Sequence, residues 1–191
     1  MNKFFITTVF LLSSLFVFSI DSTFVKVPKQ ISLELGYSNI FAQSANLTNH
    51  ASNGYGFLFD YGWKVSGLNG KKPAVYLTVP FGYTVYMADD ANSKSMHMMN
   101  YGWTVRHELS VNKPVTPFVG YALLLNNIRI TGTEGSVYGH QTKFEFGANI
   151  NTKTKLKYYA KVEGTYASFP EFNQEHRFVT WFADFRLGVR F

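Results

Sequence analysis

The chain has 191 residues, with 18 Lys and Arg against 12 Asp and Glu, and it contains no Cys. This length suits one domain, and the absence of Cys excludes disulfide scaffolds, Cys-based metal sites and thiol catalysis. Aromatic residues make up 18% of the chain and charged residues only 16%, which is little charge for an ordinary water-exposed surface. The basic residues are scattered singly, so nucleic acid is not an expected partner.

The N-terminus combines one basic residue with an apolar run. Lys3 precedes the run from Phe4 to Ile20, a pattern typical of secretory signal peptides. We expect residues 1–22 to be a signal peptide cleaved near 19–22, followed by a periplasmic segment at 23–30. A single membrane anchor is the alternative, but the run is short for spanning and lacks a strong flanking charge cluster. No later segment approaches the roughly 18 to 20 consecutive apolar residues of a membrane helix, so a membrane location would require strands.

From Ile31 onward apolar and polar residues alternate, which is the period of β-strands that separate two environments. In the second segment Tyr55, Phe57, Phe59 and Tyr61 alternate with Gly and polar residues. Each segment is longer than the roughly 5 to 6 residues of a typical globular strand and long enough for a tilted strand to cross a bilayer. The expected strands are 31–41, 53–65, 75–85, 99–110, 118–128, 141–150, 157–166 and 179–191.

The connections between these segments alternate in length, and this predicts the topology. Short turns are expected at 66–72, 112–116 and 151–155, and longer loops at 43–52, 88–97, 131–139 and 169–176. Short turns on one side and long loops on the other are typical of outer-membrane barrels. We therefore expect an all-β fold over 31–191, an eight-stranded antiparallel up-and-down transmembrane β-barrel with short periplasmic turns, longer extracellular loops and both termini in the periplasm. Pro80 lies within a strand, which predicts a bulge or a local break there.

Alternation alone does not say which face is outside, because a soluble lipocalin-like barrel has the same period with its apolar face inside. The polar face is rich in Gly, Ser, Thr and Asn with one or two charges per strand, which suits a narrow interior. The other face is almost free of charge and rich in Phe, Tyr and Trp, as in a lipid-facing band with aromatic girdles. We therefore expect the apolar face outside and a barrel plugged by side chains.

The charged residues of the polar face are nearly balanced in sign, so we expect them to form an interior ion network, since burying one of them alone costs several kcal/mol. A hairpin centred on Lys153 places Lys143 opposite Glu163 and Glu145 opposite Lys161. The expected network comprises Glu34, Asp60, Arg106, Glu108, Lys143, Glu145, Lys161, Glu163, Asp184 and Arg186, with Lys64 and Arg190 on the same face.

The eight alternating segments, the inward charges and the last strand resemble the small eight-stranded outer-membrane β-barrel family, of the OmpX and OmpA transmembrane-domain type. The last strand carries Phe185, Leu187, Val189 and Phe191 at every second position, similar to the family's assembly signal for the barrel-insertion machinery. The resemblance implies a bacterial outer-membrane location. The family is functionally diverse, so the resemblance says little about activity.

Some barrels of this size deacylate or acylate lipid A with a Ser, a His and an acidic residue, so we looked for such a set. Ser95 and His97 share one face of the fourth segment, and Asp89 or Asp90 lies in the same loop, so the three are candidates for nucleophile, base and orienting acid. The polar loop 88–97 would contain such residues in any case, and their spacing matches no motif. We therefore expect no catalytic residues, with Ser95, His97 and Asp89 as weak candidates.

Other singled-out residues have ordinary explanations at the membrane boundary. His140, with Arg129, Arg177 and Lys94, is placed to meet a lipopolysaccharide phosphate. The favoured interpretation is that these are interfacial side chains at the membrane boundary, whose contact with lipid head groups is incidental. His107 points outward near the periplasm and shares its face with no second metal ligand.

The sequence thus predicts a non-catalytic, monomeric outer-membrane barrel with a structural or surface-loop binding role and without metal or cofactor. Outer-membrane lipid, lipopolysaccharide and the barrel-assembly machinery are its expected partners, together with an unknown surface ligand. A lipid A-modifying enzyme and a soluble lipocalin-like carrier are the alternatives.

Overall fold

The computed structural model describes residues 28–44, 51–111, 113–132, 134–152, 154, 156–173 and 176–191. The predicted signal peptide and most of the predicted periplasmic segment lie outside these residues. Within them, no helix is long and apolar enough to cross a membrane. The eight strands are β1 Lys29–Gln43, β2 Asn53–Ser66, β3 Val75–Met87, β4 Met96–Glu108, β5 Val115–Ile130, β6 Val137–Asn151, β7 Lys157–Asn173 and β8 His176–Arg190.

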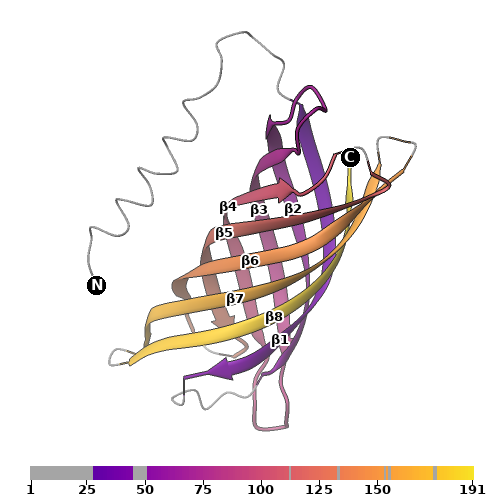
Figure 1. Ribbon diagram of the computed structural model, residues 1–191. Helices are drawn as coiled ribbons and strands as arrows, with labels where there is room; N and C mark the ends of the chain where they lie inside the picture. Colours follow the sequence, from indigo (N-terminus) through magenta and orange to yellow (C-terminus); the bar gives the residue numbers. More distant parts are fainter. Residues whose placement is uncertain are drawn as a thin grey trace, which may run out of the picture.

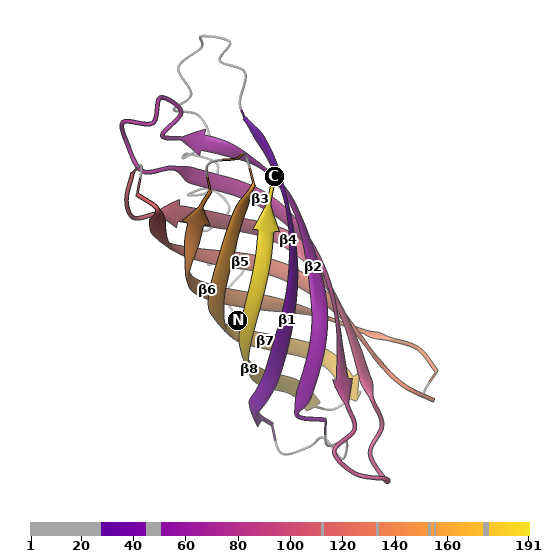
Figure 2. The ribbon, with the colours of Figure 1, turned by 90° about the vertical axis from the view of Figure 1, so that its right-hand side faces the viewer.

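The strands form one closed antiparallel barrel in sequence order, which confirms the predicted fold (Figure 1). β8 returns to pair with β1, and the backbone of Phe191 donates a hydrogen bond to Ile31 O at 2.9 Å. Figure 2 shows β8 and β1 side by side, tilted steeply along the long axis. Because the strand number is even, β1 begins and β8 ends at the same end of the barrel. We call this the turn end and the opposite one the loop end.

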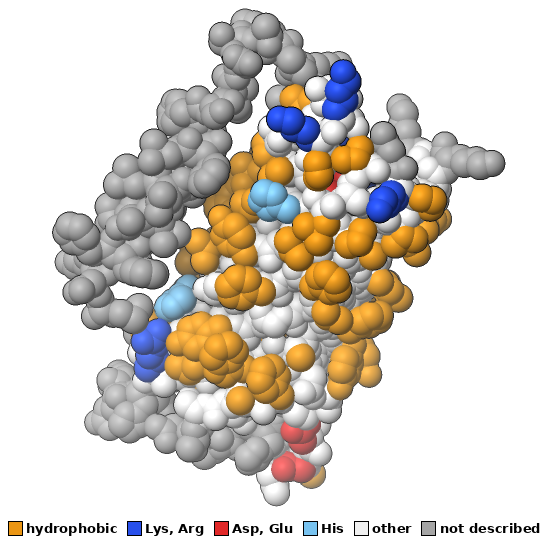
Figure 3. Space-filling view, viewed as in Figure 1, with side chains coloured by type: hydrophobic (Ala, Val, Ile, Leu, Met, Phe, Trp, Pro, Cys, Tyr) orange, Lys and Arg blue, Asp and Glu red, His pale blue; other side chains and the backbone are white. Residues whose placement is uncertain are grey.

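The two faces of the strands separate as predicted, with apolar side chains outside and charges inside. Phe57, Trp103 and Phe146 are 45%, 53% and 57% exposed, whereas Arg106 and Glu145 are 1% and 6% exposed. Figure 3 shows hydrophobic side chains spread over the barrel wall, with Lys and Arg mostly toward the end where the C-terminus lies. A lipocalin-like carrier requires the reverse arrangement, because its apolar face lines the interior.

The expected disturbance at Pro80 is a local break in one ladder. Pro80 pairs with Asp60 of β2 without a shift. On the β4 side, the pairing stops after Thr78 opposite Thr104 and resumes at Phe81 opposite Tyr101 in the same register. Proline has no N–H to donate, so the ladder with β4 is interrupted while the register is kept.

The strands are longer at the loop end than the sequence indicated. β7 continues to Asn173 and β8 begins at His176, so the expected long loop at 169–176 is mostly strand. The connections are 44–52, 88–95, 131–136 and 174–175 at the loop end, and 67–74, 109–114 and 152–156 at the turn end. The loop-end connections are therefore not markedly longer than the turn-end ones. The reason is that backbone pairing extends the strands into sequence that does not alternate between apolar and polar residues.

The register predicted between β6 and β7 is wrong by two positions. The hairpin is centred on Thr154 rather than on Lys153, so Glu145 pairs with Glu163. Within the turn, the backbone N–H of Thr154 donates to Thr152 Oγ1 at 3.2 Å. A shift of two preserves the inward face, and the opposite charges meet diagonally instead of directly.

Candidate functional site: the barrel interior and its two ends

Eight inward side chains form one connected ion network in the middle of the barrel. Its carboxylates are Glu34, Glu145, Glu163 and Asp184, and its cations are Arg106, Lys143, Lys161 and Arg186. The side chains are at most 6% exposed. Four negative groups therefore face four positive groups in a space from which bulk water is excluded, and this balance is what permits their burial.

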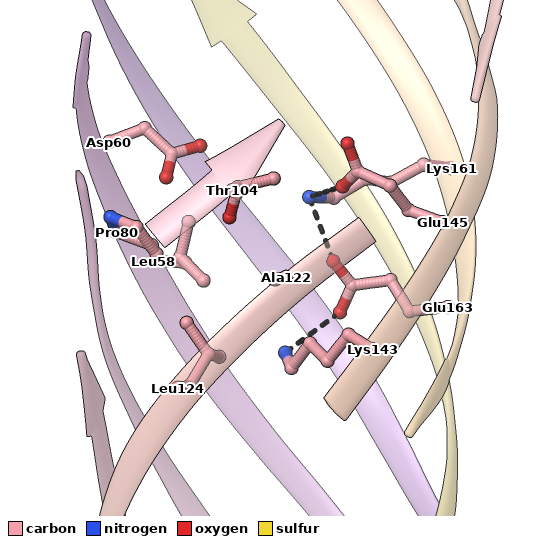
Figure 4. Close-up of a pocket in the computed structure, with 10 residues that line it drawn as sticks. All are labelled: Leu58, Asp60, Pro80, Thr104, Ala122, Leu124, Lys143, Glu145, Lys161 and Glu163. Atoms are coloured by element: carbon pink, nitrogen blue, oxygen red, sulfur yellow. Dashed lines mark hydrogen bonds and ion pairs between the residues drawn. The ribbon is translucent and has the colours of Figure 1, made fainter. Parts of the chain in front are cut away.

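Lys161 is the centre of the network. Its Nζ lies 2.9 Å from Glu34 Oε2, 2.9 Å from Glu145 Oε2 and 2.8 Å from Glu163 Oε1. An ammonium group has three donors, so these carboxylates use all of them. The like charges of Glu145 and Glu163, which face each other across β6 and β7, are thus bridged by one cation. Figure 4 shows Lys161 between these two carboxylates, with Lys143 on the far side of Glu163.

The outer members of the network extend it across the barrel. Arg106 on β4 donates to Glu145 through Nε at 2.6 Å and Nη2 at 3.1 Å. Lys143 Nζ and Arg186 Nε each lie 3.0 Å from Glu163 Oε2. Tyr159 donates to Glu34 at 2.6 Å. The two ion pairs predicted between β6 and β7 are present, and contacts between non-adjacent strands join them to the rest.

The described side chains nearly fill the interior at this level. The space between Leu58, Asp60, Pro80 and the ion network is about 10 Å³, which is room for about one water molecule. The barrel is therefore plugged at mid-height, as the strand number predicted.

Two predicted members of the network lie beside it without an ion pair among the described residues. Asp60 accepts a hydrogen bond from Ser32 Oγ at 3.2 Å. Glu108 lies nearer the turn end, where it accepts from Asn149 Nδ2 at 3.1 Å and from Tyr76 at 3.5 Å. Both carboxylates are therefore contacted by neutral donors, and Asp60 Oδ1 is buried without a hydrogen-bond partner among the described residues.

An apolar cluster fills the interior toward the loop end, and the sequence interpretation did not identify it. Tyr86 packs on Phe182 with ring centroids 5.4 Å apart, and Phe169 stacks on Phe178 at 5.7 Å. Ser38 fixes the Tyr86 hydroxyl at 2.9 Å. The sequence feature that could have predicted this cluster is the large apolar residues at inward positions of β3, β4 and β8. Apolar residues also occupy outward positions of these strand ends, so the alternation does not single out the inward ones. The cluster comprises Ile40, Ala51, Tyr86, Met96, Met98, Ile128, Ala167, Phe169, Phe178 and Phe182.

The weak catalytic candidates are engaged with other partners. His97 Nδ1 lies 2.6 Å from the Tyr83 hydroxyl, and its Nε2 lies 3.1 Å from Thr131 Oγ1. Asp89 accepts from the backbone N–H and the hydroxyl of Ser52 at 3.2 and 2.8 Å. Ser95 meets Thr131 through its backbone carbonyl at 2.9 Å. The structure therefore groups His97 with Tyr83 and Thr131 rather than with Ser95 and Asp89.

The cations singled out at the rim lie on the outer face near the loop end. His97 pairs with Arg129 across β4 and β5. His140 pairs with Ser168, whose hydroxyl accepts from Arg177 Nε at 2.5 Å. Arg129, His140 and Arg177 are exposed.

His107 is exposed on the outer face of β4 near the turn end, as expected. The described residues contain no group of three His, Cys, Asp or Glu side chains suited to hold a metal ion.

Comparison with known proteins relates the chain to others by fold. No protein-family model matches it, and no curated protein matches it in sequence. Neisserial surface protein A superposes with a TM-score of 0.65 at 15% identity, covering 85% of this chain and 95% of that one. The N-terminal barrel domain of Pseudomonas aeruginosa OprF gives 0.51 at 14% identity over 87% and 100% of the two chains. The outer-membrane enzyme PagL gives 0.50 at 13% identity over 82% and 97%.

The chain therefore has the fold of the small eight-stranded outer-membrane β-barrels, as the resemblance implied. One of the proteins that share this fold, PagL, is an enzyme. The fold by itself therefore does not decide between a structural protein, a binding protein and an enzyme.

Proposed function

We propose that this chain is a non-catalytic integral protein of the bacterial outer membrane, whose plugged barrel has a structural role or presents its loop end for binding. The observation that carries the proposal is the sidedness of the wall. Apolar side chains cover the outside of a closed barrel, while eight paired charges occupy its interior. In water the exposed apolar wall would favour aggregation, whereas in a bilayer it contacts the apolar lipid chains.

Fractionation of the expressing cells tests this proposal. The chain should sediment with the outer membrane, resist extraction by alkaline carbonate and migrate differently on gels before and after boiling. The chain in the water-soluble periplasmic fraction, with migration unaffected by heat, would contradict the proposal.

The rim cations support anionic lipid, including lipopolysaccharide, as a partner. Arg129 and Arg177 are exposed on the outer face near the loop end. Arg129 pairs with His97 across β4 and β5, and Arg177 donates to Ser168, the strand partner of His140. Guanidinium groups bind phosphate in a bidentate manner. The double variant Arg129→Gln/Arg177→Gln should retain less lipopolysaccharide through purification in mild detergent. The control Lys71→Gln/Lys72→Gln removes two exposed cations next to the turn end and should retain the normal amount; equal retention by both variants would exclude the rim as the binding site.

A second candidate function is acyl transfer at the outer rim. The contacts of His97 favour Tyr83 and Thr131 as its partners over Ser95 and Asp89. Tyr83, His97 and Thr131 form a continuous chain of hydrogen bonds at 2.6 and 3.1 Å. This is the order of an orienting group, a base and a hydroxyl nucleophile. A change in the lipid A mass spectrum on expression of the wild type, lost in both His97→Ala and Thr131→Ala, would establish the enzyme. Identical spectra with and without the wild-type chain would remove it.

A further inference from the structure

A buried guanidinium lies inside the barrel at the turn end, apart from the ion network. Arg190 is 3% exposed, and its Nε, Nη1 and Nη2 have no hydrogen-bond partner among the described residues. A buried charge is costly unless it is paired. The five donors of this group therefore require an acceptor that the described side chains do not provide.

Two tyrosine rings hold Arg190 in place while leaving its edge free. Its Cζ lies 5.0 Å from the ring centroid of Tyr76 and 5.2 Å from that of Tyr159. Stacking of a guanidinium on aromatic faces orients its plane and stabilises its charge without using its N–H groups. The arrangement thus presents a fixed edge of donors to the interior.

The surroundings of Arg190 are positive. Lys157 is its partner across β7 and β8, and Lys64 lies opposite Tyr76 on β2. Arg190 and Lys64 both lie within electrostatic range of Lys157. The carboxylate at this level is Glu108, which already accepts hydrogen bonds from Asn149 and Tyr76. Among the described side chains at this end, three cations therefore share one engaged carboxylate, in contrast to the balanced network at mid-barrel.

A second unpaired group lies beside this cluster. Gln30 is 6% exposed, and neither its amide nitrogen nor its amide oxygen has a hydrogen-bond partner among the described residues. It points to the same side of β1 as Ser32, which pairs with Arg190. Its NH₂ adds a neutral donor to the charged ones.

We propose that the turn end of the barrel is a binding site for a small inorganic anion, held by the edge of Arg190 with Lys157, Lys64 and the Gln30 amide around it. An anion satisfies the unpaired donors and offsets the surplus of positive charge. The ligand is small because Arg190 lies inside a barrel filled by side chains. Lys157 and Lys64 are half-buried and mark the route from the aqueous side.

Chloride titration tests the site directly. The full chain is refolded in detergent, and the line width of the chloride-35 NMR signal is followed while chloride is added. The excess line width in the wild type should fall along a saturation curve as chloride fills the site. Arg190→Gln should bind chloride roughly tenfold more weakly, because a hydrogen bond to a charged group is lost along with the charge. Lys157→Gln, at a less buried position, should weaken binding to a smaller degree.

Lys72→Gln is the matched control, since it removes an exposed cation next to the same end of the barrel. It should leave the chloride saturation curve unchanged. Heat-dependent gel migration establishes that each variant is folded. If Arg190→Gln does not refold, the comparison of chloride binding between Lys157→Gln and the wild type tests the proposal. An excess line width that follows no saturation curve in the wild type, or a curve that is the same in wild type and Lys157→Gln, would overturn the proposal.

Discussion

Replacing Lys161 by Met removes the cation on which the interior network depends. Lys161 contacts Glu34, Glu145 and Glu163 at 2.8 to 2.9 Å from inside the barrel wall. Without it, four carboxylates remain with three cations. Met is similar in length and apolar, so the volume is largely retained and the change acts mainly on charge.

The expected loss of stability is large because removing one partner of a buried ion pair leaves the other charge uncompensated, unlike replacing both partners. Removing one partner of a buried pair destabilises by about 3–5 kcal/mol, since a charge is left without compensation, whereas exchanging the whole pair for apolar groups is often neutral. We therefore expect Lys161→Met to lower the free energy of unfolding by about 3–5 kcal/mol. Lys161→Met/Glu145→Gln should recover a good part of this loss, because the amide removes the surplus negative charge while keeping the shape.

Urea unfolding of the chain in phospholipid vesicles measures the effect. Trp103 and Trp181 lie on the outer face, so their fluorescence reports departure from lipid. Lys72→Met, an exposed change next to the turn end, should shift the free energy of unfolding by no more than about 0.5 kcal/mol. A loss for Lys161→Met as small as that of the control, or a double variant less stable than the single one, would refute the account of Lys161 as a charge-balancing centre.

Three further changes test other parts of the structure. Leu35→Arg places a charge on the outer face at mid-strand and should cost about 2–4 kcal/mol in vesicles, whereas Leu35→Phe should be tolerated. Gly147→Ala brings a Cβ to 2.6 Å from Phe118 Cζ and 2.7 Å from Lys161 Cβ, so it should lower the free energy of unfolding by about 1–3 kcal/mol. At Gly164, where a Cβ meets nothing within 4 Å, Ala should leave the free energy of unfolding as in the wild type. Phe191→Ser should reduce the heat-modifiable fraction assembled in cells while refolding in detergent proceeds normally, because we expect this residue to be recognised during assembly; equal defects in both would instead indicate a role in stability.

The alternation along the chain determined the strands and their faces. Each outward residue such as Phe57 or Phe146 is followed by an inward one, and this local period of two holds wherever the strand is placed. It predicted the number of strands, the charges inside and the interruption at Pro80. The same period is unchanged by a shift of two residues, which explains why the faces of β6 and β7 were predicted correctly and their register was not.

The sequence by itself therefore determined an eight-stranded barrel with an apolar wall and charged interior, because strand period and strand length are local properties. Only the tertiary structure decided which interior groups meet. Closure and tilt of the barrel bring Glu34 of β1 to Lys161 of β7, and they stack Arg190 of β8 between Tyr76 and Tyr159. These partners lie on strands whose separation around the barrel depends on all eight registers together, which the alternation of residues along each strand does not encode.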